Sequence, residues 1–192
     1  MKKLTMILLG AALVMGAASC GSKKNTVTPT LQPGEVEIVQ YCTGPEFMTD
    51  ATHFRANGTG LSTDRQVAKD KALLAARAEL ATEIKATIKR VSDRYNSSYN
   101  VGEDDETRGK FQDLVRQVVD QTLNGSVVIC DKLTRDDQGK YRSYVCVELK
   151  GEDIANQLKN GISKDEKLRT DYEYEKFKKV FDDEMSKLKN EQ

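Results

Sequence analysis

The 192-residue sequence predicts an α+β fold in which a long helix packs on a small antiparallel sheet. Residues 63–95 contain neither glycine nor proline and repeat apolar side chains at helical spacing, which predicts one long helix. Residues 126–134 and 141–149 are rich in Val, Ile, Tyr and Thr and flank a glycine-containing turn, which is typical of a β-hairpin. Residues 164–192 are charged and amphipathic, which adds a helix at the C-terminal end.

The chain begins with the pattern of a bacterial lipoprotein signal. Two lysines precede an apolar run over residues 4–18, which is shorter than the ~20 apolar residues that span a bilayer. The run ends in Ala17-Ala18-Ser19-Cys20, which resembles the lipobox at which such proteins are cleaved and acylated. We therefore expect residues 1–19 to be a signal peptide, and acyl chains such as palmitate on Cys20 to hold the mature chain on a membrane.

Polar and short extended segments follow this signal. Residues 20–34 are polar and hold two of the three prolines, so we expect a flexible tether. The alternation of polar and apolar side chains in residues 35–42 predicts a short strand. Residues 53–57 predict another strand, which Gly58-Thr59-Gly60 should close with a tight structural turn.

The long helix is expected to begin with a capping box of Thr63 and Gln66, or with Ser62 as the cap one residue earlier. Its apolar residues form two stripes, and the helical period favours core packing over a ligand groove. The stripe of large residues is Leu73, Leu80, Ile84, Ile88, Val91 and Tyr95. The face of small residues, which lets a helix lie close to a sheet or a second helix, is Ala68, Ala72, Ala75, Ala76 and Ala81.

A polar loop over residues 96–105 and a second helix over residues 106–123 separate the long helix from the hairpin. In the hairpin, pairing of Asp136 with Lys140 sets the register. That register places one set of side chains on a common face, which we expect to lie against the long helix. The set is Val127, Ile129, Leu133, Ser143, Val145, Val147 and Leu149.

The same register places Cys130 opposite Cys146 on the other face of the hairpin. Cross-strand Cβ atoms lie about 4.5–5.5 Å apart, against an ideal separation of about 3.8 Å for a disulfide. Cys130 and Cys146 are therefore a candidate disulfide pair, and two free thiols are an equal alternative. Cys42 could compete for either partner, and an exported protein would meet an oxidising compartment.

The C-terminal part is expected to hold a short helix over residues 151–160, broken by Gly161, and then the charged helix over residues 164–192. Ion pairs at i, i+4 spacing should support the charged helix. Its apolar stripe is narrow, and docking on its own domain is favoured over a partner protein. The domains are therefore 35–163, which forms the α+β body, and 164–192, which forms an added helix.

Composition excludes several classes of function. The mature chain has 28 basic against 30 acidic residues, which offers no electrostatic attraction for nucleic acid. His53 is the only histidine and there is no Cys-x-x-Cys pair, so neither a metal nor a cofactor is expected. Gly58-Thr59-Gly60 lacks the third glycine of a dinucleotide fingerprint. No motif marks a catalytic residue.

One set of residues resembles a known family. Phe54-Arg55-Ala56-Asn57-Gly58-Thr59-Gly60 leads into Ser62, Asp64, Ala68, Ala72, Ala76-Arg77 and Leu80-Ala81. This pattern resembles the Lpp-twenty family of 20-kDa bacterial membrane lipoproteins, and the preceding segment from Cys42 to Phe47 is similar to its members of the Bacteroides type. The resemblance implies a dodecin-like arrangement of helix and sheet and an envelope lipoprotein without known enzyme activity.

These observations predict a non-enzymatic lipoprotein on the periplasmic face of the outer membrane. Its partners would be the membrane, through acyl chains on Cys20, and an envelope protein or further copies of itself. The alternative is a small-ligand-binding or hydrolytic envelope protein with a pocket between helix and sheet. Polar groups of His53, Arg55 and Arg77 around a cavity would favour this alternative, and a packed apolar interface would oppose it.

Overall fold

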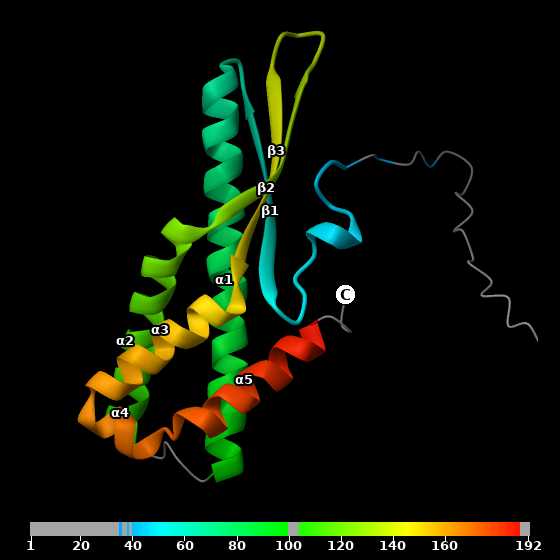
Figure 1. Ribbon diagram of the computed structural model, residues 1–192. Coiled ribbons are helices and arrows are strands. Elements are labelled where there is room, and N and C mark those ends of the chain that lie inside the picture. Colours follow the sequence, from blue (N-terminus) through cyan, green and yellow to red (C-terminus); the bar gives the residue numbers. More distant parts are fainter. Residues whose placement is uncertain (1–34, 36–37, 39, 100–103, 189–192) are drawn as a thin grey trace, which may run out of the picture. The chain divides into compact units, whose positions relative to one another are not determined.

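The computed structural model describes residues 35, 38, 40–99 and 104–188. The signal peptide, Cys20 and the tether lie outside these residues, so the expectations for them stay predictions. The chain divides into two units, Met1–Ile38 and Val39–Gln192, and every helix and strand of the described residues belongs to the second. This unit combines a three-stranded antiparallel sheet with a long helix packed on it, which confirms the α+β class (Figure 1).

The sheet has the strand order β1-β3-β2, with every neighbouring pair antiparallel. Its strands are β1 (His53–Ser62), β2 (Val127–Arg135) and β3 (Tyr141–Lys150). The expected turn at Gly58-Thr59-Gly60 is wrong, because β1 runs straight through these residues to Ser62. The two glycines serve the packing of a helix on the strand rather than a change of chain direction.

Helix α1 (Arg65–Tyr99) lies against β1 closely enough that a side chain at either glycine would collide with its backbone. A Cβ atom at Gly58 would lie 2.2 Å from the carbonyl oxygen of Ala72 and 2.4 Å from the nitrogen of Ala76. At Gly60 it would lie 2.1 Å from the carbonyl oxygen of Ala68. The three alanines are fully buried, so part of the predicted small-residue face is confirmed as the contact with the sheet.

The start of α1 differs from the predicted capping box. The side chain of Asp64 accepts a hydrogen bond from the backbone N–H of Val67 at 2.9 Å, and Ser62 Oγ accepts one from the N–H of Asp64 at 3.2 Å. Because β1 continues to Ser62, the helix starts later than expected and Asp64 takes the capping position.

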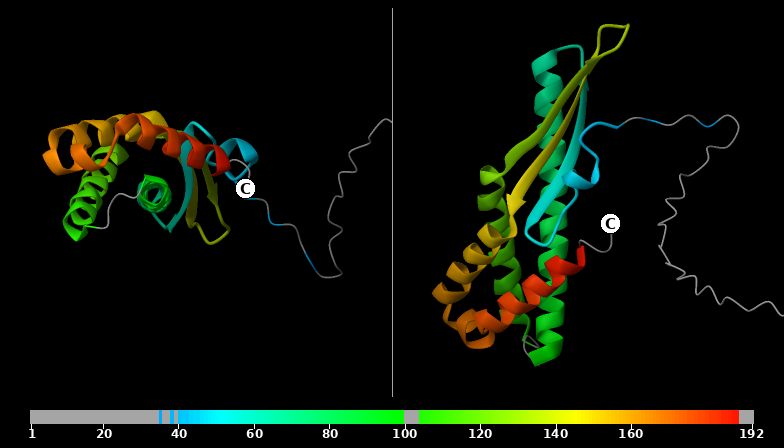
Figure 2. Two further views of the ribbon diagram at one scale, coloured as in Figure 1. Left: turned by 90° about the horizontal axis from the view of Figure 1, so that it is seen from below. Right: turned by 45° about the vertical axis from the view of Figure 1, so that its right-hand side comes forward.

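The C-terminal half of α1 packs on helices instead of strands (Figure 2). These are α2 (Asp105–Thr122), α3 (Gly151–Lys164), α4 (Glu166–Asp171) and α5 (Tyr174–Leu188). Stacked rings fill the junction: Phe111 lies 4.6 Å and Tyr95 lies 5.2 Å from Tyr172 between ring centroids. The large-residue stripe of α1 is therefore core, as predicted, although Leu73 is only partly buried.

Two predictions for the C-terminal part are wrong. Gly161 does not end α3, because the helix continues to Lys164, and a Cβ at Gly161 would lie 2.0 Å from Leu114 Cδ1 on α2. The single charged helix is divided into α4 and α5, and the backbone N–H of Glu173 at the break donates to the Tyr95 hydroxyl at 2.9 Å. Helix α5 nevertheless docks on α1 with its apolar side chains buried, as expected.

The predicted hairpin register is confirmed from the turn as far as Cys130, which pairs with Cys146. A bulge between Val128 and Cys130 then shifts the pairing by one residue. The expected common face is only half correct. The β3 members are buried, whereas Val127 is 61% and Leu133 is 37% exposed, because α1 covers β1 and β3 and leaves β2 at the edge.

Candidate functional site

A segment that we call the strap, residues 41–52, crosses the face of the sheet opposite α1. It meets three outward-facing side chains: Cys42 bonds to Cys130, the Phe47 carbonyl lies 3.7 Å from Cys146 Sγ, and the Met48 carbonyl accepts from Arg55. The strand expected at residues 35–42 does not form at the described positions, and residues 41 and 42 make a turn instead. The strap therefore covers the sheet without adding a strand to it.

The disulfide joins Cys42 to Cys130, with Cα atoms 5.7 Å apart, and Cys146 is a free, fully buried thiol. The candidate pair of Cys130 and Cys146 is therefore wrong in this structure, although the two residues are register partners as predicted. Direct cross-strand neighbours keep their Cβ atoms wider apart than a disulfide prefers. The strap approaches from above the sheet and is free of that spacing.

Burial fixes the chemical state of the remaining thiol. The buried surroundings raise the pKa of Cys146 to about 11, and the nearby Arg55 guanidinium opposes this effect only in part. Cys146 is consequently protonated at neutral pH, and a protonated thiol is a poor nucleophile.

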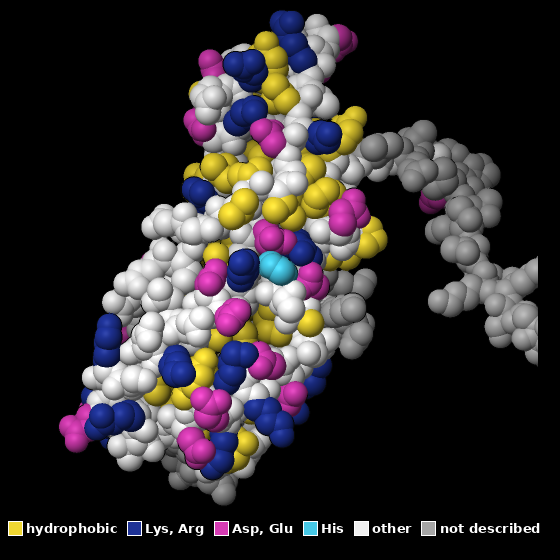
Figure 3. All heavy atoms as spheres, in the orientation of Figure 1, with side chains coloured by type: hydrophobic (Ala, Val, Ile, Leu, Met, Phe, Trp, Pro, Cys, Tyr) yellow, Lys and Arg dark blue, Asp and Glu magenta, His cyan; other side chains and the backbone are white. Residues whose placement is uncertain are grey.

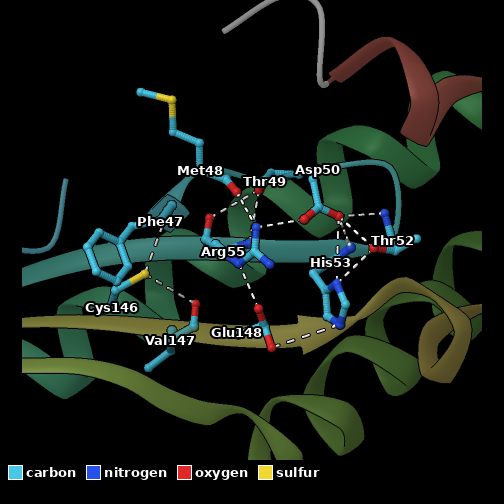
Figure 4. Close-up of polar contacts among 10 residues, drawn as sticks. All are labelled: Phe47, Met48, Thr49, Asp50, Thr52, His53, Arg55, Cys146, Val147 and Glu148. Atoms are coloured by element: carbon cyan, nitrogen blue, oxygen red, sulfur yellow. Dashed lines mark hydrogen bonds and ion pairs between the residues drawn. The ribbon is translucent and has the colours of Figure 1, made fainter. Parts of the chain in front are cut away.

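A group of charged side chains holds the other end of the strap (Figures 3 and 4). Arg55 donates from Nη1 to Asp50 Oδ2 at 2.7 Å and to the Met48 carbonyl at 2.8 Å. It also donates from Nε to Glu148 Oε2 on β3 at 2.7 Å. Its side chain is 13% exposed, so these bonds form in a largely dry setting. One guanidinium thus joins the strap to two strands.

Asp50 is the centre of a turn that ends the strap. Its Oδ1 accepts from the backbone N–H of Thr52 at 2.8 Å, the Thr52 hydroxyl at 2.7 Å and the N–H of His53 at 2.9 Å. Burial alone would raise the pKa of Asp50, but the hydrogen bonds from Thr52, Arg55 and His53 outweigh it and hold the pKa far below its usual range. The charged carboxylate is therefore part of the folded structure.

Thr52, His53 and Glu148 lie in an order that resembles a nucleophile, a base and an orienting acid. Thr52 Oγ1 is 2.8 Å from His53 Nδ1, and His53 Nε2 is 3.9 Å from Glu148 Oε1. The Thr52 hydroxyl has one proton, and the charged Asp50 carboxylate is the stronger acceptor for it. His53 Nδ1 then donates to Thr52 instead of removing its proton, so this arrangement stabilises the turn and does not activate a nucleophile.

Replacing Asp50 by asparagine tests this turn through its pH dependence. Because the folded pKa of Asp50 is depressed, its contribution is fully present above the unfolded value near 3.8 and is lost as the pH falls further. We expect Asp50→Asn to lower the free energy of unfolding by about 2 kcal/mol at pH 7, a value discounted for partial exposure. The difference from the unmodified protein, measured by urea unfolding, should shrink below pH 4; a pH-independent difference would contradict the assignment.

The three residues proposed to surround a pocket are not brought together. His53 and Arg55 lie on the strap side of the sheet, whereas Arg77 on α1 donates from Nε to Ser126 Oγ at 3.1 Å. The space between α1 and β1 is filled by the glycine–alanine contact, which opposes the alternative of a pocket there. A hollow of about 400 Å³ lies elsewhere, between α1 and α2, with Ile88 and Phe111 among its walls.

Sequence reasoning missed Asp50 and Glu148. Glu148 is the register partner of Arg55 in the β1–β3 pair, so correct pairing of these strands would have placed the opposite charges side by side. Among the described residues, no three His, Cys, Asp or Glu side chains gather as a metal site would require. None of the helices in the described part of the chain is both long and apolar enough to cross a membrane.

Comparison with models of known protein families found none that matches the chain, and comparison with curated protein sequences found no match.

Proposed function

We propose that this protein is a lipid-anchored envelope protein without enzymatic activity that binds another envelope protein through the edge strand β2. One observation carries the proposal. Strand β2 lies at the edge of the sheet, exposes apolar side chains, and is bonded covalently through Cys130 to Cys42, next to the proposed tether. A strand fixed in this way presents a stable surface at the end of an anchor.

The exposed side chains of β2 suit contact with a protein. Val127 is 61%, Val128 44% and Leu133 37% exposed, and Figure 3 shows hydrophobic side chains gathered over the sheet region. An edge strand also offers unpaired backbone N–H and C=O groups, to which an extended segment of a partner can add as a further strand. The chemistry therefore favours a partner with an apolar strand of its own.

The disulfide also supports the proposed compartment. Disulfides persist in the periplasm and outside the cell and are rare in the cytosol. This agrees with export by residues 1–19 and acylation of Cys20, and the resemblance to the Lpp-twenty lipoproteins points the same way. Multiple acyl chains on Cys20 would anchor the chain without a membrane-spanning helix.

Photocrosslinking in intact cells tests both parts of the proposal. We expect a benzophenone side chain at Val127 to crosslink to an envelope protein, and the same group at Gln121, an exposed position on α2, to give no such product. Cys20→Ser should move the protein out of the detergent phase on phase separation and abolish the crosslink. Equal crosslinking from both positions, or none from Val127, would remove the support for a β2 surface.

A further inference from the structure

Three cysteines meet on the strapped face of the sheet, and Cys130 lies between the other two. Cys42 is bonded to it from the strap, while Cys146 is its register partner on the neighbouring strand β3. Cys130 and Cys146 project on the same side of the sheet, since opposed residues of antiparallel strands share a face. Either cysteine can therefore reach the Cys130 sulfur with little change in the sheet.

The present partner is held in an uncommon backbone conformation. Cys42 has a φ of 61°, and no other non-glycine residue of the described chain has a positive φ. Side chains other than glycine adopt this left-handed region at a cost, and such residues gather where structure is held against its preference. Release of Cys42 would remove that constraint.

The competing partner is kept unreactive by the strap. Cys146 is fully buried, and its Sγ contacts the carbonyl of Phe47 in the middle of the strap. Arg55 and Glu148 are the charged groups that act on the thiol, and they favour and oppose its ionised form respectively. Lifting the strap would expose Cys146 to water and remove the burial that suppresses ionisation.

We propose that Cys130 is a thiol–disulfide exchange site, at which Cys146 displaces Cys42 and the strap is released from β2. Cys146 loses its proton to solvent, and the thiolate sulfur attacks Sγ of Cys130. The bond between Cys130 and Cys42 breaks, and Cys42 leaves as a thiolate that takes up a proton. One disulfide and one thiol are present before and after, so no oxidant or reductant is required.

The exchange changes where a force on the N-terminal side of the chain is carried. With Cys42 bonded to Cys130, a pull on the chain before Cys42 acts directly on β2. After exchange the same pull reaches the domain through the strap and its contacts with β1. The inference rests on the cysteine geometry and does not require the proposed partner of β2.

Disulfide mapping of the purified full chain tests the exchange. Samples held at pH 7 to 10 are quenched in acid, alkylated and digested without reduction. We expect the alkylated cysteine to change from Cys146 to Cys42 as a Cys130–Cys146 peptide forms, about tenfold faster per pH unit while the pH is below the thiol pKa. Asp50→Asn, which loosens the strap, should accelerate the change at every pH.

Cys146→Ser is the matched control, because it retains the Cys42–Cys130 bond and lacks the attacking thiol. Alkylation of Cys42 at the same rate in this variant and in the unmodified chain would overturn the proposal, since hydroxide would then be the attacking group. Formation of disulfide-linked dimers in place of the Cys130–Cys146 peptide would also overturn it.

Discussion

Gly58→Ala is expected to destabilise the domain severely, with a loss of about 3 kcal/mol or more in the free energy of unfolding. The added methyl group would meet backbone atoms of α1 at 2.2 and 2.4 Å, and a backbone cannot rotate away as a side chain can. The helix must move off the strand, and the buried contact of β1 with α1 is lost along much of its length. Urea unfolding followed by circular dichroism measures the effect.

Gly109→Ala is the matched control for this substitution. Gly109 lies at an exposed position inside α2, and a Cβ there would meet nothing within 4 Å. Since glycine inside a helix is less favourable than alanine, this change should stabilise the protein by about 0.5–1 kcal/mol. A similar loss in both variants would show that close packing on α1 is not what requires glycine at position 58.

Removing the disulfide is the second change with a large expected effect. In a Cys146→Ala background, where only one disulfide can form, Cys42→Ser should lower the free energy of unfolding by about 2–5 kcal/mol. The bond joins residues 88 positions apart, and closing so long a loop restricts the unfolded chain strongly. The unfolded reference state, more than any lost contact in the fold, therefore carries the effect.

The same experiment separates the disulfide from the packing of the strap. Adding a reductant to the Cys146→Ala protein should reproduce the loss, whereas the Cys42→Ser variant should not respond to reductant. A reductant effect of equal size in both proteins would contradict the assignment of the bond to Cys42 and Cys130.

The elements that local patterns define were predicted well. The period of the apolar residues placed α1 and α2, and the turn around Gly139 fixed the hairpin register as far as Cys130. The alanine face of α1 was also recognised as a surface for close packing. These features follow from residues near each other in the chain, for which spacing and propensity are informative.

The features that were missed depend on contacts between distant segments. Gly58 looked like a turn residue because its reason for being glycine, the backbone of α1, lies in another element. Gly161 looked like a helix breaker for the same reason, since its constraint comes from Leu114 on α2. The disulfide depends on how residues 41–52 cross the sheet, and no local pattern specifies that path.

The bond between Cys42 and Cys130 gives the protein a tolerance to being cut. A protease that cleaves once between these two residues opens the chain but leaves both fragments in one covalent molecule. With Cys20 acylated as proposed, a nicked protein would keep β2 and everything after it at the membrane until a reductant or the exchange at Cys130 released them. The length of chain enclosed by the disulfide, including the segment that joins α1 to α2, is therefore the part of this protein in which a single cut does not shed the domain.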